Sequence, residues 1–457
     1  MIQLPEIFLQ QMKALLPADQ FMKFCESYKK PAMRGVRFNR LKVAQDAALL
    51  KACYSLPFYD HPSVPWCADG RIYLDTERPA KSIYYHAGIF YIQEPSAMCP
   101  VEVLNPKPGH RVLDLCAAPG GKSVQIAGHL QGRGMLVAND ASPSRCRALV
   151  KNLERMGVTN AIVSTEQPKK LARRFPVFFD KILVDAPCSG EGMFRRDPDA
   201  VKAYTANKPE ACVVMQMEIL RYAAEMLKPG GQLVYSTCTF NTMENEGVIE
   251  NFLKANKDFA IVPINHAIYG ISQGLNNLPQ SGRIFPHLAP GEGHFVALLE
   301  KLGMNCSFSH ETAATMHSSK EFTIFCKEYI TATNFPIGEI VSHGSNLYLQ
   351  PEPLDLRGLR VARSGWFLGE CTKGRFVPSQ ALAMGLLKSD VRYAVELSEE
   401  NASRYLRGES LDAGGMFKDN LQGKPWVMVC YLGFPLGWAK LVQGRLKNNL
   451  PVGWAVS

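Results

Sequence analysis

The sequence predicts an α/β protein with a doubly wound parallel sheet at its core, an α+β region before it and a smaller β-rich region after it. Two observations predict the core. Between residues 111 and 238, short apolar runs alternate with helical patterns, which is typical of parallel sheets. A Pro-Gly-Gly turn at 119–121 joins the first of these runs to a helical pattern. Such turns lie at the carboxyl edge of a sheet, where ligands bind.

Composition restricts the class of protein. The chain has 457 residues, 46% of them hydrophobic, which leaves room for several domains with ordinary cores. A net charge of +9 suits a nucleic-acid partner without establishing one. The 13 cysteines are scattered and form no C-x-x-C pair, so neither a disulfide framework nor a metal site is expected. No apolar run could span a membrane and no signal peptide is visible, so we expect a cytoplasmic protein without a membrane partner.

Residues 1–90 form the first expected region. An amphipathic pattern broken at Pro17 predicts two helices. The segment RGVRFNRLKV at 34–43 predicts a basic strand, because Arg37 and Asn39 alternate with apolar residues. Its charged face is either a solvated sheet edge or a surface that contacts RNA.

The central region, residues 91–301, contains the alternating pattern. We expect strands at 111–115, 134–140, 160–165, 179–186, 232–238 and 294–299, and helices at 121–130, 143–156, 209–227 and 243–255. In such sheets ligands bind outside the carboxyl ends of the strands. The distinctive residues of this chain follow those ends.

Residues 302–322 are polar and rich in Ser and Thr, so we expect a linker. Beyond it we expect an accessory domain at 323–390 and a β-rich domain at 391–457. Helical patterns at 378–387 and 391–407 accompany short β-type runs, and the tail is typical of hairpins with exposed Lys and Arg. Our interpretation is a region that binds nucleic acid, and the alternative is a structural cap.

The turn after the first core strand is the central motif. Its glycines lack the Cβ atoms that would keep a ligand from the backbone, and the next helix presents free N–H groups. A phosphate-binding loop needs a glycine where Cys116 stands, and the dinucleotide pattern G-x-G-x-x-G is absent. NTP hydrolysis at Gly121-Lys122-Ser123 is therefore not expected.

Asp140 ends the second core strand about twenty residues after the turn, the spacing at which an acid binds ribose hydroxyls. A nucleoside cofactor that needs no phosphate site fits both motifs, and S-adenosyl-L-methionine is the candidate. The alternative role for Asp140 is to cap the helix that begins near Ser142.

Two cysteines follow core strands. Cys188 comes after the strand that ends near Asp185, and Cys238 comes at the end of the strand at 232–238. Methylation of cytosine at carbon 5 needs a thiolate beside a methyl donor, because sulfur added at carbon 6 makes carbon 5 nucleophilic. Asp185 is placed to stabilise charge that develops at ring nitrogen 3. A second cysteine can assist product release.

Together these motifs resemble the NOL1/NOP2/Sun family of RNA cytosine-5 methyltransferases. The shared segments are Gln93-Glu94-Pro95-Ser96, Asp114 to Ser123, Asn139-Asp140, Asp185 to Gly192, Ser236-Thr237-Cys238-Thr239 and Gly293-His294-Phe295. The resemblance implies a Rossmann-like S-adenosylmethionine methyltransferase sheet, with Cys238 as nucleophile and Cys188 as the residue that helps release the product. Lys122 and Glu94 would support the site.

The resemblance also implies a cofactor pocket. Its residues would be Cys116, Ala117, Ala118, Pro119, Gly120, Gly121, Lys122, Asp140 and Asp185. The sequence departs from the family at one position, since Gln167, next to Glu166, stands where the family usually has an aspartate near the adenine. An amide can also pair with an adenine edge.

Within the family, the basic N-terminal segment, DAPCSGEGMFRRDPDA, KGRFVPSQALA and GFPLGWAKLVQGRLKN resemble the bacterial RsmF (YebU) type. This implies methylation of cytosine in the decoding region of 16S rRNA, on small ribosomal subunits, and a PUA-like RNA-binding domain at 391–457. We expect a monomer. The alternatives are a tRNA or DNA substrate, or a non-catalytic RNA-binding assembly factor; intact Cys238, Cys188 and Asp185 argue against the assembly factor.

Overall fold

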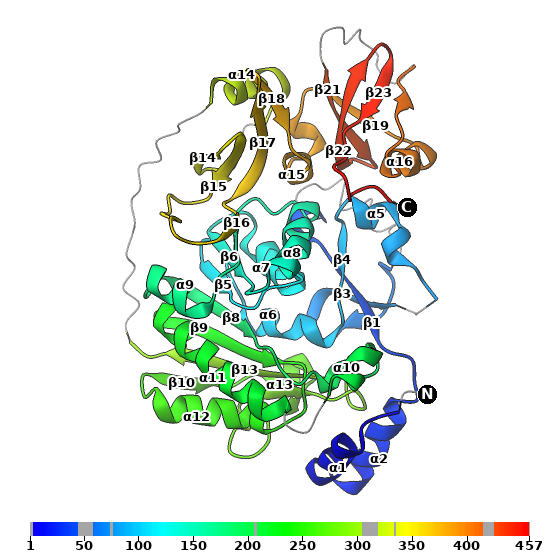
Figure 1. Ribbon diagram of the computed structural model, residues 1–457. Coiled ribbons are helices and arrows are strands. Elements are labelled where there is room, and N and C mark those ends of the chain that lie inside the picture. The colour runs from blue at the N-terminus through cyan, green and yellow to red at the C-terminus, as the bar shows by residue number, and fades with distance from the viewer. Residues whose placement is uncertain are drawn as a thin grey trace.

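The computed structural model describes residues 3–43, 58–73, 76–204, 208–303, 319–332, 335–414 and 425–456. The N-terminal region packs on one side of a central α/β region, and the C-terminal region covers one end of it (Figure 1). Within the described residues, no helix is long and apolar enough to cross a membrane.

The central sheet has ten strands in the order β11-β12-β13-β9-β8-β5-β6-β7-β16, with β10 paired to β13. The strands are β5 (Arg111–Asp114), β6 (Met135–Asn139), β7 (Ala161–Ser164), β8 (Phe179–Asp185), β9 (Leu227–Thr237), β10 (Phe259–Val262), β11 (Ser272–Gln273), β12 (Gly282–Ile284), β13 (His294–Lys301) and β16 (Val361–Arg363). Strands β5 to β9 are parallel, as predicted.

The parallel pairing predicted for the sheet does not extend to its edges. Strand β13 runs antiparallel to β9 and β12, and β16 runs antiparallel to β7. A parallel connection needs a long crossover, usually a helix. No helix separates β12 from β13, and β16 comes from the C-terminal region, so neither edge strand is part of a β-α-β unit.

Helices cover both faces of this sheet (Figure 1). One apolar core lies under α6 (Cys99–Leu104), α7 (Gly121–Leu130) and α8 (Pro143–Arg155), and the other lies under α9 (Pro168–Arg174), α11 (Lys208–Met226) and α12 (Val248–Ala255). Shorter helices are α10 (Pro198–Lys202), α13 (His266–Tyr269) and a π-helical turn at Met243–Gly247 before α12. The predicted strands and helices between 111 and 255 are present, and α9 and α10 are additional short helices.

In the N-terminal region, α1 (Glu6–Leu15) and α2 (Ala18–Ser27) meet at Pro17, as predicted. They precede an antiparallel sheet of order β2-β3-β1-β4. Its strands are β1 (Arg34–Phe38), β2 (Ser63–Val64), β3 (Cys67–Tyr73) and β4 (Phe90–Ile92), accompanied by the short helices α3 (Arg40–Val43) and α5 (Ile83–His86). Both interpretations of the basic strand are wrong for Arg37 and Asn39, because β1 is an inner strand and both side chains are buried.

The C-terminal region begins with α14 (Lys320–Tyr329), so residues 320–322 of the expected linker are helical, while 304–318 lie outside the described residues. Two sheets follow, β14-β15-β17-β18 and β19-β21-β22-β23-β20. Their elements are β14 (Glu339–His343), β15 (Asn346–Gln350), β17 (Trp366–Thr372), β18 (Arg375–Pro378), α15 (Gln380–Gly385), β19 (Ala394–Glu396), α16 (Glu399–Leu406), β20 (Leu411–Asp412), β21 (Trp426–Tyr431), β22 (Phe434–Val442) and β23 (Arg445–Asn448).

The tail forms the predicted hairpins, but the helix expected over 391–407 is confined to α16. Strand β19 takes the preceding residues because it pairs in parallel with β21. This long-range partner is not visible in the local pattern.

Candidate active site

The two cysteines of interest meet at the carboxyl edge of the sheet. Strands β8 and β9 are parallel neighbours, with Asp185 opposite Ser236. The loops that follow these strands therefore leave the same edge. In this arrangement the Cys188 Sγ and the Cys238 Sγ are 3.5 Å apart. Both sulfurs can therefore act on one substrate atom or on each other.

A set of short contacts joins the two cysteine loops, residues 186–192 and 238–242. Ser189 Oγ lies 2.7 Å from Thr239 Oγ1, and the Gly192 N–H donates to the Cys238 carbonyl at 2.8 Å. A Cβ on Gly192 would lie only 2.9 Å from the carbonyl oxygens of Cys238 and Gly293. The loops touch so closely there that only glycine fits.

The carboxylate of Glu191 connects these loops to the N-terminal helices. One oxygen accepts from Thr239 Oγ1 at 2.8 Å and from the Phe240 N–H at 2.9 Å. The other accepts from the Tyr204 hydroxyl at 2.9 Å and from Gln11 Nε2 of α1 at 3.2 Å. The side chain has no exposed surface. Sequence reasoning missed this role, although Glu191 lies within the same motif as Cys188.

Aromatic side chains surround this connection. Phe8 and Phe24 of α1 and α2 pack against Phe194 and Phe240, which follow the two cysteines. The N-terminal helices thus cover the back of the cysteine loops. Burial of this kind excludes water from the hydrogen bonds and makes their geometry harder to distort.

The two thiols differ in their surroundings. The hydrogen bond with Cys238, together with burial, raises the pKa of the Cys188 thiol well above its usual range. Cys188 therefore keeps its proton and can donate its S–H toward the Cys238 sulfur. Burial acts to lower the pKa of Lys122, but Asp185 and Cys238 outweigh it and raise that pKa. Lys122 therefore carries its positive charge close enough to interact with Cys238.

Asp185 lies among three polar side chains. It accepts hydrogen bonds from Lys122 Nζ at 2.7 Å and Ser236 Oγ at 2.9 Å, and His294 Nε2 lies 3.6 Å away. Burial acts to raise the pKa of Asp185, but Lys122 and His294 hold it well below its usual range. The carboxyl is therefore ionised at neutral pH and forms an ion pair with the Lys122 ammonium. Its side chain is 31% exposed, so a base can reach it.

The glycine turn is shaped by the protein's own side chains. Gly120 has a left-handed φ of 112°, and its missing Cβ leaves room for Leu149 of α8 at 3.0 Å. The missing Cβ of Gly121 leaves room for Tyr91 of β4 at 3.1 Å. The expectation that these glycines open the backbone to a ligand is therefore wrong, because both bare faces point into the protein. The rest of the segment from Cys116 to Lys122 lies at the same edge as the cysteines.

Asp140 holds this turn against the start of α8. One oxygen accepts the Ala118 N–H at 3.2 Å and lies 3.3 Å from Arg145 Nη1. The other accepts the N–H of Ser142, the residue that precedes α8, at 3.0 Å. This contact is not a helix cap, because Ser142 is the N-cap residue of α8 and no described side chain caps that helix with a hydrogen bond, so the alternative role for Asp140 is wrong. The contact leaves lone pairs on a carboxylate that faces the cofactor edge.

Asn139 and Glu166 complete this edge. Asn139 Nδ2 donates to the carbonyls of Leu115 and Glu166, and its oxygen accepts from Ser164 Oγ. The buried Asn139 thus fastens together the ends of β5, β6 and β7. Glu166 is occupied by Lys170 at 2.8 Å and by the Arg360 N–H at 2.6 Å. Gln167, at the start of α9, is exposed.

Glu94 does not contact the cysteines. Its carboxylate accepts N–H groups of Ser96, Ala97 and Glu292, each at 2.9 Å. These bonds fix the loop that leads into β13, where His294 lies. Glu94 therefore acts on the site only through the position of that loop.

Asp114, at the carboxyl end of β5, suggests how a cofactor is held. Its Oδ2 accepts from Ser123 Oγ at 2.6 Å, while its Oδ1 is buried and has no hydrogen-bond partner among the residues that the structure describes. Burial raises the pKa of Asp114 to about 7. An unpaired carboxylate oxygen at this edge fits an ammonium group, such as that of the methionine part of S-adenosylmethionine.

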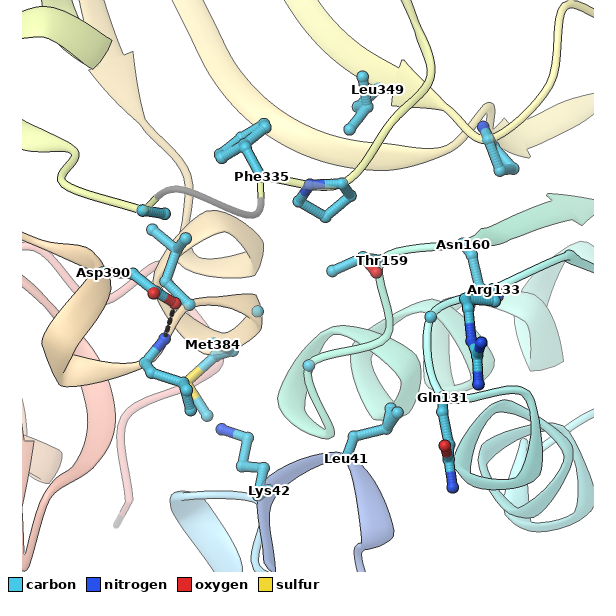
Figure 2. A pocket seen from close by; sticks show the side chains of 18 of the residues that line it. Leu41, Lys42, Gln131, Arg133, Thr159, Asn160, Phe335, Leu349, Met384 and Asp390 are labelled. Atoms are coloured by element: carbon cyan, nitrogen blue, oxygen red, sulfur yellow. Dashed lines mark hydrogen bonds between the residues drawn. The ribbon is translucent and has the colours of Figure 1, made fainter. Parts of the chain in front are cut away.

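A cavity of about 750 Å³ lies elsewhere in the molecule (Figure 2). It is lined from α3, from the loops before β6 and β7, and from the C-terminal region, including Lys42, Arg133, Asn160, Phe335 and Met384. These loops leave the amino end of the parallel strands. The cavity is therefore at the opposite edge of the sheet from the cysteines and is not part of their site.

Comparison with known proteins gives four consecutive family matches. Residues 4–95 match the N-terminal domain of 16S rRNA methyltransferase RsmF, and residues 101–300 match 16S rRNA methyltransferase RsmB/F. Residues 324–386 match the first C-terminal domain of RsmF rRNA methyltransferase, and residues 392–456 match the methyltransferase RsmF PUA domain.

Individual relatives agree. Ribosomal RNA small subunit methyltransferase F of Erwinia tasmaniensis is 32% identical, over 98% of this chain and 96% of its own. The protein of the same name from Shewanella amazonensis is 33% identical, over 99% and 98%. A solved structure of a methyltransferase homologue from Pyrococcus horikoshii has a TM-score of 0.55 and 32% identity, and covers 65% of this chain and 95% of that one.

Proposed function

The chain belongs to the RsmF group of the 16S rRNA methyltransferase RsmB/F family, and we propose that it methylates carbon 5 of a cytosine through a covalent bond to Cys238. Members of this family are S-adenosylmethionine-dependent rRNA methyltransferases, so the substrate is rRNA or the small ribosomal subunit. The observation that carries the proposed chemistry is the pair of cysteines 3.5 Å apart at the carboxyl edge of the sheet.

The first step is addition to the base. Cys238, reacting as the thiolate, gives its electron pair to carbon 6 of cytosine, with the Lys122 ammonium interacting with the same sulfur. The electrons of the 5,6 double bond move through the ring to nitrogen 3. The hydrogen-bonded pair of Lys122 and Asp185 supplies a proton there. Carbon 5 has then become an enamine carbon that can accept a methyl group.

The second step is release. Once carbon 5 carries both hydrogen and methyl, its proton leaves to solvent and the electrons of that C–H bond re-form the double bond. The bond between carbon 6 and sulfur breaks, and its electrons return to Cys238. Cys188 keeps its proton and stabilises the departing Cys238 sulfur through a hydrogen bond from its S–H. The proton on nitrogen 3 returns to the pair of Lys122 and Asp185.

S-adenosylmethionine supplies the methyl group. We propose that it is held by the segment Cys116, Ala117, Ala118, Pro119, Gly120, Gly121 and Lys122, together with Asp114, Asp140 and Asp185. Asp114 offers its unpaired oxygen to the ammonium group, and Asp140 keeps acceptor capacity for ribose hydroxyls. Because Glu166 is occupied, Gln167 is the side chain left to face the adenine.

Family membership does not specify which nucleotide of the rRNA is methylated, so the site on the RNA is a separate proposal. We propose a cytosine in the decoding region of 16S rRNA, recognised by a monomer in the cytoplasm. The division would be an RNA-binding region at 1–90, the methyltransferase domain at 91–301, a linker that ends before α14 at residue 320, an accessory domain from there to 390 and a PUA-like domain at 391–457. The target base must leave its stack, which costs a few kcal/mol and is easiest in an irregular helix.

Methyl transfer to naked 16S rRNA, to assembled small subunits and to tRNA tests this substrate. We expect incorporation at cytosine carbon 5 in one of the first two and none in tRNA. Binding should weaken steeply with salt, because Lys and Arg contacts to phosphates release counterions. Modification of tRNA alone would contradict the substrate, and incorporation at another atom would contradict the chemistry.

A further inference from the structure

The N-terminal sheet contacts the cofactor turn directly. Arg37 of β1 is only 3% exposed, and its guanidinium crosses to the first turn of α7. Nη2 donates to the Gly121 carbonyl at 3.0 Å, and Nη1 donates to Gln125 Oε1 at 3.2 Å. A buried arginine thus holds the peptide that follows the turn.

The orientation of the Gln125 amide, which accepts from Arg37, is fixed by the partners of its NH2 group. Gln125 Nε2 donates to the Met98 carbonyl and to Glu102, each at 2.9 Å, so its oxygen must face Arg37. Glu102 is paired with His129 and makes no ion pair with Arg37 among the described residues. Burying a cation without an adjacent carboxylate is costly. An apolar side chain would fill the same space without this cost in free energy. The buried Arg37 therefore indicates that the hydrogen bonds its guanidinium donates have a function.

Tyr91 of β4 adds two contacts. Its ring lies beneath the Arg37 guanidinium, 5.8 Å from centre to centre, and against the bare face of Gly121. Its hydroxyl lies 3.3 Å from Asn152 Nδ2, which donates to the Pro119 carbonyl at 2.8 Å. Arg37 of β1 thus holds the Gly121 peptide directly, although the two residues are 84 positions apart in sequence. Tyr91 of β4 contacts Asn152 of α8, which holds the Pro119 peptide.

We propose that Arg37, supported by Tyr91, is a positioning residue for S-adenosylmethionine binding. Its two hydrogen bonds set the orientation of the first turn of α7, and through it the backbone that receives the cofactor. The N-terminal sheet therefore shapes the cofactor site as well as any RNA surface it carries. This inference rests on the proposed function, because it requires the cofactor to bind at residues 116–122.

The test measures cofactor affinity and RNA affinity separately. Equilibrium dialysis gives the Kd for S-adenosylmethionine, and RNA binding is measured as a function of salt. In Arg37→Met, which keeps the apolar stem, we expect the cofactor Kd to rise by about tenfold, the worth of one hydrogen bond to a charged donor. The salt dependence of RNA binding should not change.

Two further variants sharpen the result. Arg34→Met, on the opposite face of the same strand, is the matched control and should leave the cofactor Kd unchanged. Arg37→Lys retains the charge and can reach the Gly121 carbonyl, so it should recover part of the affinity. If circular dichroism shows that Arg37→Met does not fold, the cofactor Kd of Arg37→Lys is the test of the proposal. A purely structural role would lower the melting temperature without changing the Kd of the folded protein.

An unchanged cofactor Kd in folded Arg37→Met, or in Arg37→Lys where Arg37→Met does not fold, would overturn the proposal. So would a loss of RNA affinity with a salt slope reduced by about one, the signature of a lost phosphate contact. Failure of the proposed function looks different, because the wild-type protein would then not bind S-adenosylmethionine at all.

Discussion

Replacement of Glu191 by glutamine tests how tightly the two cysteine loops must be held. The carboxylate accepts hydrogen bonds from Gln11, Tyr204, Thr239 and Phe240. An amide of the same shape keeps one acceptor oxygen and places an NH2 group where the other oxygen was. Each carboxylate oxygen of Glu191 accepts from two donors, so the new NH2 group faces at least one N–H or O–H group with which it cannot form a hydrogen bond.

The magnitude follows from the geometry. A buried donor left unpaired costs about 1–3 kcal/mol, and the Tyr204 hydroxyl can rotate to accept. We expect Glu191→Gln to lower the free energy of unfolding by about 2 kcal/mol. Glu191→Ala also leaves a cavity and should cost about 3–5 kcal/mol. Displacement of the cysteines by a fraction of an ångström should reduce kcat by about tenfold or more.

Urea unfolding and methylation of small-subunit RNA at saturating cofactor measure the two effects. Asp180→Asn is the matched control, because both oxygens of Asp180 likewise accept hydrogen bonds, one each, but Asp180 lies at the amino end of β8, away from Cys188. It should lower stability and leave kcat per folded molecule unchanged. If Glu191→Gln has the kcat of the wild type per folded molecule, Glu191 does not set the cysteine geometry.

Three other changes probe the cofactor edge and the core. Because the pKa of Asp114 is about 7, cofactor affinity measured by dialysis should rise by about eightfold from pH 6 to pH 7.5 as this carboxyl ionises, and Asp114→Asn should abolish that rise; a rise that persists in the variant would exclude Asp114. Gly192→Ala should lower stability by about 1–3 kcal/mol in urea unfolding and slow methylation, because its Cβ would press on the Cys238 carbonyl; unchanged values of both would contradict the close contact. Arg283→Leu removes the cation that pairs with the buried Glu246, so it should cost about 3–5 kcal/mol in urea unfolding, and a loss below about 1 kcal/mol would show that another group compensates the Glu246 charge.

The parallel core could be predicted from sequence because its signal is local. Each apolar run and helical pattern between 111 and 238 lies within one short window. The meeting of Cys188 and Cys238 follows from geometry alone, since the carboxyl ends of parallel strands share an edge. The structure places their sulfurs 3.5 Å apart.

The remaining features depend on partners far away in the chain. Alternation in β1 shows that Arg37 and the apolar side chains point to opposite faces, but not that α7 covers the charged face. The glycines of the turn are required by Leu149 and Tyr91, which no local pattern connects to them. In the same way, Glu166 is occupied by Arg360 from the C-terminal region, a contact that only the folded chain creates.

The central claim is that Cys238 forms the covalent bond and Cys188 releases it. The most direct measurement is a denaturing gel of Cys188→Ala, alone and combined with Cys238→Ala, after incubation with small-subunit RNA and S-adenosylmethionine. We predict that Cys188→Ala accumulates a covalent protein–RNA band and that the double variant shows none. A band that survives the loss of Cys238, or methylation by Cys238→Ala alone, would contradict the assigned roles.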